Sequence, residues 1–327
     1  GAYEVPALSP EHDETVRDKA IAFLKSGARP ACDFPDEDSL RRLMALMTGG
    51  PVEDWIFQFG QEELNLEPMP RGAAWNGAAP EGDRRNAVDV VIIGAGAAGL
   101  VTAIQLKRLG IPFTIIERNA DVGGTWWTND YPDARVDIPS HHYQLTVTQA
   151  HPWRHWFAPQ QELLEYLRGI ADQFELRPHI RFNTELTEAT WDESASAWNY
   201  SLRTSDGMTE TNSARVLVSA AGLFNEPNMP DIVGIETFGG RIFHTTNWEH
   251  DFDYGGKRVG IIGVGCTGAQ LMPAIARKAA QVDIFQRSPH WVSRLEGYRD
   301  EIPSEIQWLL ANVPYYWNWH CFNVFYT

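Results

Sequence analysis

Cysteine is scarce in this sequence, which holds only three among 327 residues. Cys32, Cys266 and Cys321 lie too far apart for a CxxC redox pair or a metal knuckle, and an odd, sparse count argues against a disulfide framework. The HExxH and GxSxG signatures of metal-dependent and serine hydrolases are missing as well. We therefore predict a cytoplasmic protein without a metal site.

Clustered positive charge and long apolar runs are also missing. The 27 basic residues are outnumbered by 43 acidic ones, and the net charge of −16 repels phosphate backbones and anionic lipids. The most apolar window, residues 90–104, is interrupted by three glycines, and the chain does not open on a basic region followed by an apolar stretch. These absences predict no nucleic-acid partner, no signal peptide and no membrane span.

Two stretches of the chain repeat one pattern: a strand, a glycine turn, a helix and a second strand. The pattern starts at Val88 and again at Lys257, and it is typical of dinucleotide-binding βαβ units. Between the two we expect a helix over residues 160–174, alternating strands around 182–191 and 198–203, and a buried strand at 215–220. This order suits an α/β domain with an inserted antiparallel meander.

The first 86 residues follow a different pattern. Two segments show helical periodicity, and residues 68–85, rich in proline, glycine, alanine and arginine, follow as a linker or strap. The periodic positions are Thr15, Ile21, Phe23 and Leu24 in the first segment and Leu40, Leu43, Leu46 and Met47 in the second. Because single cores stop growing near roughly 250–300 residues, we expect a helical extension ahead of two further domains.

The first glycine turn has the spacing of a dinucleotide site. Gly94 would permit the tight turn, Gly96 the approach of a pyrophosphate to the helix N-terminus, and Gly99 the close packing of helix on strand. The next strand ends in Glu117, 23 residues after Gly94, where a carboxylate can accept both ribose hydroxyls. The alternative is a structural glycine turn beside a solvated glutamate.

The second glycine turn repeats the spacing but differs at the ribose position. Its residues are Gly263, Gly265, Thr267 and Gly268. Gln286 takes the place of the carboxylate and is followed by Arg287 and Ser288. A guanidinium beside a hydroxyl can hold a ribose 2′-phosphate, which a carboxylate would repel, so the site is predicted to prefer NADPH. The alternative is that Arg287 only ends a solvated strand.

Two sites of different ribose chemistry imply one tightly held and one exchanging dinucleotide, with electron transfer between them. A disulfide reductase would add a redox cysteine pair just after the first βαβ unit, and the sequence has none there.

Further segments resemble the Baeyer–Villiger monooxygenases. Residues 121–127 and 131–137 look like the flavin-contact segment of that family, and residues 219–222 resemble its linker signature. The family fingerprint FxGxxxHxxxW is matched by Phe238, Gly240, His244 and Trp248, although Glu249 stands where Pro or Asp is usual. The N-terminal extension is similar to that of the hydroxyacetophenone monooxygenase branch.

The resemblance implies roles for individual residues. Glu117 would bind the FAD ribose, and the flavin would be contacted by Thr125, Trp126, Trp127, Tyr143 and Leu186, with Gly124 and Asp137 as further cofactor-binding residues. Arg135 and Asp137 would be the catalytic pair on the nicotinamide side, with the second glycine turn on the NADPH pyrophosphate and Arg287 and Ser288 on its 2′-phosphate. Trp126 and Trp127 could instead pack in the core, and His244 and Trp248 are expected to link domains rather than to act in catalysis.

The predicted fold is therefore α/β, with two Rossmann-like domains for FAD and NADPH, an inserted antiparallel meander and an N-terminal helical extension. Residues 1–86 would form the extension and linker, 87–225 the first part of the FAD-binding domain, 226–256 the fingerprint linker and 257–327 the NADPH-binding domain. The extension is also a candidate homodimer contact.

The reaction that the resemblance implies inserts one oxygen from O2 next to a ketone carbonyl, giving an ester or lactone. NADPH would reduce FAD, and oxygen would add to the reduced ring as a C4a-peroxide. The alternatives are a flavin N- or S-oxygenating monooxygenase, whose fingerprint lacks the tryptophan that Trp248 supplies, and a non-catalytic nucleotide-binding fragment of a longer enzyme. The family's catalytic arginine is expected beyond Thr327, and the aromatic residues 308–326 are expected in a core or pocket helix rather than a membrane anchor.

Overall fold

The computed structural model describes residues 9–27, 35–67, 69, 71–224, 226–292, 295 and 297–326, so that Cys32 and Thr327 lie outside the described residues. The chain divides into two compact units. The helical unit comprises Gly1–Arg71, Val136–Ala158 and Val292–Thr327, and the α/β unit comprises Gly72–Arg135 and Pro159–Trp291. The boundaries of these two units differ from those of the four segments predicted from the sequence. The assignment of those segments as domains stays a prediction.

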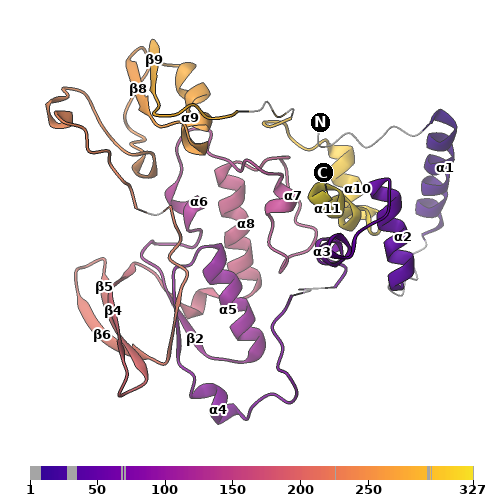
Figure 1. Cartoon of the computed structure of the whole chain (residues 1–327), viewed down its shortest axis with the longest axis horizontal. Coiled ribbons are helices and arrows are strands. Elements are labelled where there is room, and N and C mark those ends of the chain that lie inside the picture. Colours follow the sequence, from indigo (N-terminus) through magenta and orange to yellow (C-terminus); the bar gives the residue numbers. More distant parts are fainter. Residues whose placement is uncertain are drawn as a thin grey trace. The chain divides into compact units, whose positions relative to one another are not determined.

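The helical unit consists of helices and the loops between them, and two of its helices carry side-chain N-caps. The helices are α1 (Pro10–Ser26), α2 (Glu37–Thr48), α3 (Asp54–Leu64), α7 (Ser140–Tyr143), α10 (Ser304–Asn312) and α11 (Tyr316–Tyr326), labelled in Figure 1. The Ser9 hydroxyl accepts a hydrogen bond from the first turn of α1, and the Asp36 carboxylate does the same for α2. Both helices end at a left-handed glycine, Gly27 and Gly49. The two predicted N-terminal helices are confirmed, and α3 is an addition that the sequence analysis did not expect.

The core of the helical unit lies between α2, α3 and α11. It consists of Leu40, Met44, Phe57, Leu64 and Phe322. The helix predicted from the period of Leu40, Leu43, Leu46 and Met47 is present, but the side chains of Leu43, Leu46 and Met47 are 41%, 79% and 45% exposed. The buried stripe is centred between Leu40 and Met44, which leaves Leu43 and Met47 at its edge and Leu46 beyond it. Helix α1 buries none of its residues.

The aromatic tail spans the end of α10, which buries none of its residues, and all of α11, which is the core helix predicted for it. Trp317, Cys321, Phe322 and Val324 of α11 are buried. A Cβ atom on Gly60 of α3 would lie 2.6 Å from the Phe322 ring, so a glycine lets the ring approach the α3 backbone. Within the described residues, no helix is long and apolar enough to cross a membrane.

A four-stranded parallel sheet organises the α/β unit. Its order is β3-β2-β1-β7, with β1 (Val90–Ile93), β2 (Phe113–Ile116), β3 (Ile180–Arg181) and β7 (Val216–Ser219). The helices of this part are α4 (Gly82–Asn86), α5 (Ala97–Leu109), α6 (Thr125–Thr128) and α8 (Gln160–Gln173), with the 3-10 turn η1 (Arg177–His179). Strands β1 and β2 pair in register from Val90–Phe113 to Ile93–Ile116, so their carboxyl ends meet at one edge.

The inserted meander packs on this sheet. Strands β4 (Thr184–Asp192), β5 (Ala197–Thr204) and β6 (Thr209–Ala214) form a three-stranded antiparallel sheet. Leu202 and Ala214 of the meander form one buried cluster with Val91 and Ile116 of the parallel sheet. Strand β7 is an edge strand that pairs with β1, and Val216 is 39% exposed, so the expectation of a buried strand there is wrong.

The second βαβ unit repeats the first on a smaller scale. Strands β8 (Arg258–Ile262) and β9 (Gln281–Phe285) pair in parallel and are joined by α9 (Cys266–Ala276). The 3-10 turns η2 (Ile235–Thr237) and η3 (Thr245–Asn247) lie in the segment before it. The α/β prediction, with two Rossmann-type units and an antiparallel insertion, is confirmed.

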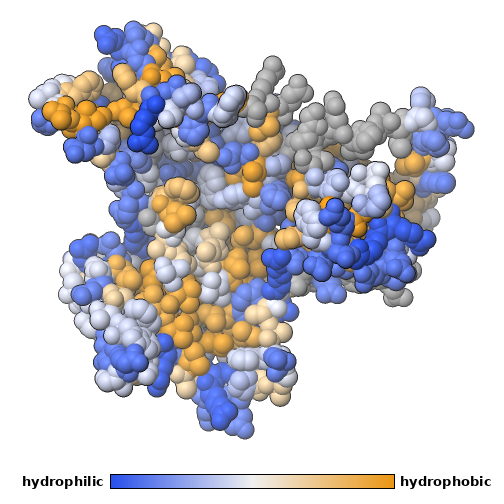
Figure 2. All heavy atoms as spheres, viewed as in Figure 1, coloured by the Kyte–Doolittle hydropathy of each residue, from blue (hydrophilic) through white to orange (hydrophobic). Residues whose placement is uncertain are grey.

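Apolar side chains remain at the surface of the second βαβ unit. Ile262, Ile284 and Phe285 are 60%, 45% and 59% exposed. Figure 2 shows orange surface around the region that Figure 1 labels β8 and β9. A two-stranded sheet with one helix leaves one of its faces open.

A buried histidine pair in the helical unit predicts acid sensitivity. The rings of His141 and His320 meet edge to face with centroids 4.5 Å apart. Burial, followed by the charges of His320 and His151, lowers the pKa of His141 well below its ordinary value, and burial lowers the pKa of His320 to about 4. Both imidazoles are therefore neutral in the folded protein near neutral pH.

We predict that the free energy of unfolding falls as the pH drops below 6.5, because the unfolded chain takes up protons there and the folded chain does not until about pH 4 at His320. His320→Phe should reduce the slope by up to about 1.4 kcal/mol per pH unit, measured by urea unfolding between pH 5 and pH 7.5. The control is His12→Phe on exposed α1. An unchanged slope in His320→Phe would contradict the prediction.

Candidate functional site

The first glycine turn has a backbone that only glycines can form. Gly94 has φ of +104°, and a Cβ on Gly99 would lie 1.9 Å from the Gly94 carbonyl oxygen. Helix α5 starts directly after Gly96 without a side-chain cap. The amide groups of its first turn are therefore available to an anion, as in dinucleotide-binding folds.

Glu117 closes this turn from the end of β2. The residue is 3% exposed, and its carboxylate accepts hydrogen bonds from the Ala95 amide at 2.7 Å and from the Asn119 amide and side chain at 2.8 and 2.7 Å. The residue predicted to bind a ribose thus also braces the glycine turn. A carboxylate has about four acceptor positions, so one remains for a ribose hydroxyl rather than the two expected from the sequence.

The segment after Glu117 lies against the same turn. The Gly123 amide donates to the Ala95 carbonyl at 3.1 Å, and a Cβ on Gly124, whose φ is +53°, would lie 2.8 Å from the Gly96 Cα. Gly94, Gly96, Gly99, Glu117 and Gly124 are therefore brought together by the fold. Thr125 is exposed at the start of α6, and Trp126 and Trp127 are half-buried.

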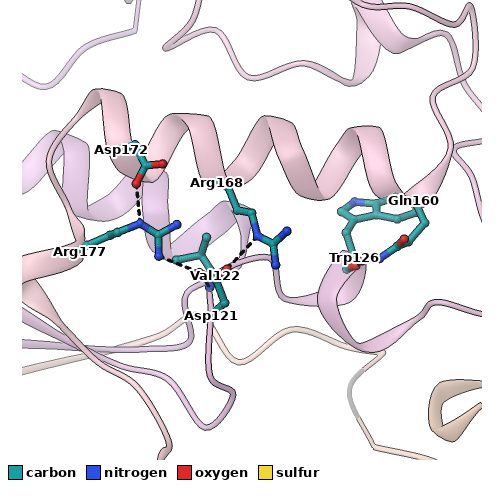
Figure 3. A network of polar contacts seen from close by, with 7 residues as sticks. All are labelled: Asp121, Val122, Trp126, Gln160, Arg168, Asp172 and Arg177. Atoms are coloured by element: carbon teal, nitrogen blue, oxygen red, sulfur yellow. Dashed lines mark hydrogen bonds and ion pairs between the residues drawn. The ribbon is translucent and has the colours of Figure 1, made fainter.

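Asp121 anchors that segment to α8 and η1 (Figure 3). Its carboxylate meets Arg168 and Arg177, each at 2.8 Å, and accepts the Val122 amide at 2.8 Å. Arg177 also pairs with Asp172, and the Gln160 side chain donates to the Trp126 carbonyl. Burial raises the pKa of Asp121, but the hydrogen bonds from Arg177, Val122 and Arg168 outweigh it and hold the pKa below its usual value.

Trp127 lies at a hollow on this surface rather than in a core. The Arg168 guanidinium stands 5.6 Å from its ring centroid, a cation–π contact. The hollow, of about 600 Å³, is also lined by Asp130, Leu164 and His250.

The second glycine turn repeats the backbone of the first. Gly263 has φ of +102°, Gly265 has φ of −65° and ψ of −173°, and a Cβ on Gly268 would lie 2.4 Å from the Gly263 carbonyl oxygen. The corresponding values are +104° at Gly94, and −78° and −173° at Gly96. Two segments of one chain therefore form the same anion-binding turn.

Arg287 and Ser288 follow β9 at the edge where this turn lies. Both are exposed, and the Gly263 amide donates to the Phe285 carbonyl at 2.9 Å, which places the end of β9 beside the turn. Thr267 is half-buried in the first turn of α9. The predicted second site is thus built from adjacent chain segments.

Three further residues were predicted to contact a cofactor. Asp137 and Tyr143 belong to the helical unit and are both exposed. Leu186 of β4 packs on the buried cluster of the sheet and meander, which is a structural contact. Their roles at a cofactor stay predictions.

The fingerprint residues make local contacts. The His244 side chain accepts the Thr246 amide at 3.1 Å and starts η3. Trp248 packs edge to face on Phe243, with ring centroids 5.1 Å apart, and joins the cluster around α9. Phe238 is 62% exposed, and a Cβ on Gly240 would lie 2.6 Å from its ring. Glu249, the departure from the fingerprint, pairs with Arg241.

Sequence reasoning missed one polar residue of this region. Gln270 is 7% exposed on α9, and its amide bonds to Tyr131 and to both backbone groups of Arg135. A glutamine among the mostly apolar residues of a helix was the available signal. Arg135 itself pairs with Asp133 at 2.8 Å, and both side chains are 10% exposed.

Two glycine turns of one geometry, on two parallel βαβ units, define a protein with paired dinucleotide folds. Residues 87–303 match the flavin-binding monooxygenase-like family. The chain belongs to this family.

Several relatives are similar to this chain. A Baeyer–Villiger monooxygenase of Streptomyces coelicolor is 41% identical over 63% of this chain and 39% of its own length. An uncharacterised monooxygenase of Sinorhizobium fredii is 36% identical over 91% of this chain and 44% of its own length. This chain thus spans about two fifths of the length of these relatives.

Solved structures give the same result. OTEMO in complex with FAD and NADP is 37% identical, with a TM-score of 0.63 over 69% of this chain and 44% of that chain. Cyclohexanone monooxygenase bound to ε-caprolactone is 32% identical, with a TM-score of 0.62 over the same shares. The resemblance to Baeyer–Villiger monooxygenases is confirmed, whereas the hydroxyacetophenone branch stays a prediction.

We predict that Asp121→Asn costs about 1–3 kcal/mol of stability, because two guanidinium groups lose their carboxylate partner. The wild-type carboxylate stabilises the fold above pH 3.8, and this contribution is lost as the pH falls through its lower folded pKa. Chemical unfolding at pH 7 measures the loss. The control, Asp192→Asn, changes an exposed turn of the meander, and an equal effect of both variants would sink the prediction.

Proposed function

We propose that this chain is the dinucleotide-binding part of an FAD- and NADPH-dependent monooxygenase that uses O2 to convert a ketone into an ester or lactone. The observation that carries the proposal is the pair of equal glycine turns with different ribose positions, Glu117 at the first and Arg287 at the second. The names of the relatives and the ligands of OTEMO support it.

The residues at the first turn fit FAD. The uncapped start of α5 would hold the pyrophosphate, and Glu117 would accept a ribose hydroxyl while bracing the turn. Gly124 leaves room against Gly96 that a side chain would fill, and Thr125, Trp126 and Trp127 begin the segment that would face the flavin. When bound, the flavin would supply the electron transfer and the activation of oxygen.

The residues at the second turn fit NADPH. The start of α9 also lacks a side-chain cap, and Thr267 lies in its first turn. Arg287 and Ser288 would hold the 2′-phosphate through charge-assisted hydrogen bonds. These contacts orient the nucleotide and do not reach the reacting atoms.

We assign the catalytic pair to Arg135 and Asp137. Asp133 holds the Arg135 guanidinium in a nearly buried position, where a positive charge acts more strongly than in water. Asp137 would adjust its electrostatics. The protein around them must also exclude water, which would otherwise divert the reducing equivalents.

We place the protein in the cytoplasm, in keeping with its few cysteines. We also propose a homodimer through the N-terminal helices, on which Leu43 and Leu46 are exposed apolar residues.

The proposal predicts that the chain takes up FAD and NADPH, and that the complete enzyme of which it is a part oxidises NADPH with a ketone and forms an ester or lactone. The measurement is product mass with a panel of aryl, cyclic and linear ketones, alongside an amine and a sulfide. Products from the amine or sulfide alone would assign the chain to N- or S-oxygenation. Protein that takes up neither FAD nor NADPH would overturn the proposal.

Arg287→Ala is predicted to raise the Kd for NADPH about 10- to 100-fold, because a charge-assisted contact worth about 1.5–3 kcal/mol is lost. The Kd for NADH should change less than about twofold. Equilibrium titration measures both. The matched control is Arg277→Ala, which removes an exposed arginine at the opposite end of α9. Equal effects of Arg287→Ala on the two nucleotides would refute the assignment.

A further inference from the structure

Gln270 is a buried residue whose side-chain amide binds one short segment, residues 131–135. Its Oε1 accepts from the Tyr131 hydroxyl at 2.9 Å and from the Arg135 amide at 3.4 Å, and its Nε2 donates to the Arg135 carbonyl at 2.9 Å. A side-chain amide that binds both backbone groups of one residue fixes its orientation, which an apolar or singly bonded side chain cannot do.

The surroundings of these bonds are apolar. Tyr131, Ala134, Ile261, Leu271 and Ile275 form a buried cluster that joins the segment to β8 and α9. Hydrogen bonds that are shielded from water hold their geometry firmly, because breaking them leaves unpaired polar groups in a low-dielectric site.

The segment that Gln270 binds is a tight turn. The Ala134 amide donates to the Tyr131 carbonyl at 3.1 Å, Pro132 occupies the second position, and Asp133 has φ of +68°, the pattern of a type II turn. The left-handed conformation of Asp133 is uncommon for a residue with a side chain, and its ion pair joins the turn to Arg135, the residue directly after it.

The chain leaves the α/β unit directly after this turn. It passes from Arg135 to Val136 and returns at Pro159, which bridges Arg135 in antiparallel fashion, and the Gln160 amide donates to the Ala134 carbonyl at 2.8 Å. Gln270 therefore binds the backbone where the chain leaves the α/β unit, at Arg135, next to the point where it returns, at Pro159.

Helix α9 connects this point to the second glycine turn. The Ala269 amide, one residue before Gln270, donates to the Gly265 carbonyl at 2.9 Å. A dinucleotide bound at the start of α9 would thus be linked to Arg135 through one rigid helical turn and one amide group.

We propose that Gln270 is a positioning residue that keeps Arg135 in register with the dinucleotide at the second glycine turn. This inference rests on the proposed function of that turn. Gln270 touches neither the nucleotide nor the reacting atoms in this assignment, and it acts through the backbone of Arg135.

Hydrogen exchange resolved at single amides tests the inference. Gln270→Met keeps the length of the side chain and removes its hydrogen bonds, so the Arg135 amide should exchange about tenfold faster or more. Tyr131→Phe is the control, since it removes one bond to Gln270 and leaves the two at Arg135, and it should change this rate less than about twofold.

The same experiment with saturating NADP+ separates the inference from the proposed function. In the wild type, NADP+ should slow exchange both at residues 263–269 and at residues 131–135. In Gln270→Met the first effect should remain and the second should be lost, and the hydride-transfer rate from NADPH to FAD should fall about tenfold with the KM for NADPH within about threefold.

Each other outcome counts against a defined statement. Exchange at Arg135 that is unchanged in Gln270→Met, or an NADP+ response at residues 131–135 that survives the substitution, would overturn the inference alone. Uniformly faster exchange that includes β1 and α5 would reduce Gln270 to a residue of the fold and overturn it too. Absence of any NADP+ effect at residues 263–269 in the wild type would overturn the proposed NADPH site, and the inference with it.

Discussion

The contact on which the α/β unit depends is the approach of a helix to the turn that precedes it. A Cβ on Gly99 would lie 1.9 Å from the Gly94 carbonyl oxygen, and Gly268 meets the Gly263 carbonyl in the same way at 2.4 Å. No side chain can occupy either position without moving backbone, so each helix is held against its strand with its N-terminus at the carboxyl edge of the sheet. The anion-binding capacity of both turns follows from this steric constraint, and the nucleotide chemistry is then set by the residues that follow the second strand of each unit.

Glu117 links this constraint to chemistry. Its buried carboxylate accepts a hydrogen bond from the Ala95 amide and so fixes the turn without the help of a ligand. Asp121, four residues later, ties the following segment to α8 and η1 through Arg168 and Arg177. Glu117 and Asp121 together hold Gly123 and Gly124 against the turn. A structural role and a proposed ligand role therefore coincide in Glu117, which explains why spacing from the glycines locates it so well.

Residue spacing in the sequence correctly predicted those features that depend on residues close together in the chain. Both glycine turns, Glu117, the meander and the core helix at the end of the chain depend on short patterns of glycine, apolar alternation or aromatic residues. Features that depend on contacts between distant segments of the chain could not be predicted from this spacing. The helical periodicity of α2 did not show which of its apolar side chains are buried: Leu43 is 41% exposed, whereas Met44 is buried in one cluster with Phe322 of α11. Val216 looked buried because its strand is apolar, yet β7 is an edge strand. Gln270 carried only a weak signal, since its partners lie 135 and 139 residues away.

The two glycine turns have the same backbone conformation but differ in the segments that cover them. This difference affects how readily each bound nucleotide can exchange. A Cβ on Gly96 would lie 3.3 Å from the Gly124 Cα, so the first turn is covered by the segment that Asp121 anchors. A Cβ on Gly265 would meet no described atom within 4 Å, so the second turn is open on its outer side. A nucleotide under a covering segment leaves slowly because that segment must move first, whereas one on an open turn is released by breaking its own contacts. The covered turn is the one with the ribose carboxylate, and the open turn is the one with Arg287. This asymmetry supports a retained flavin at the first and an exchanging NADPH at the second, the order that repeated reduction of one cofactor by another requires.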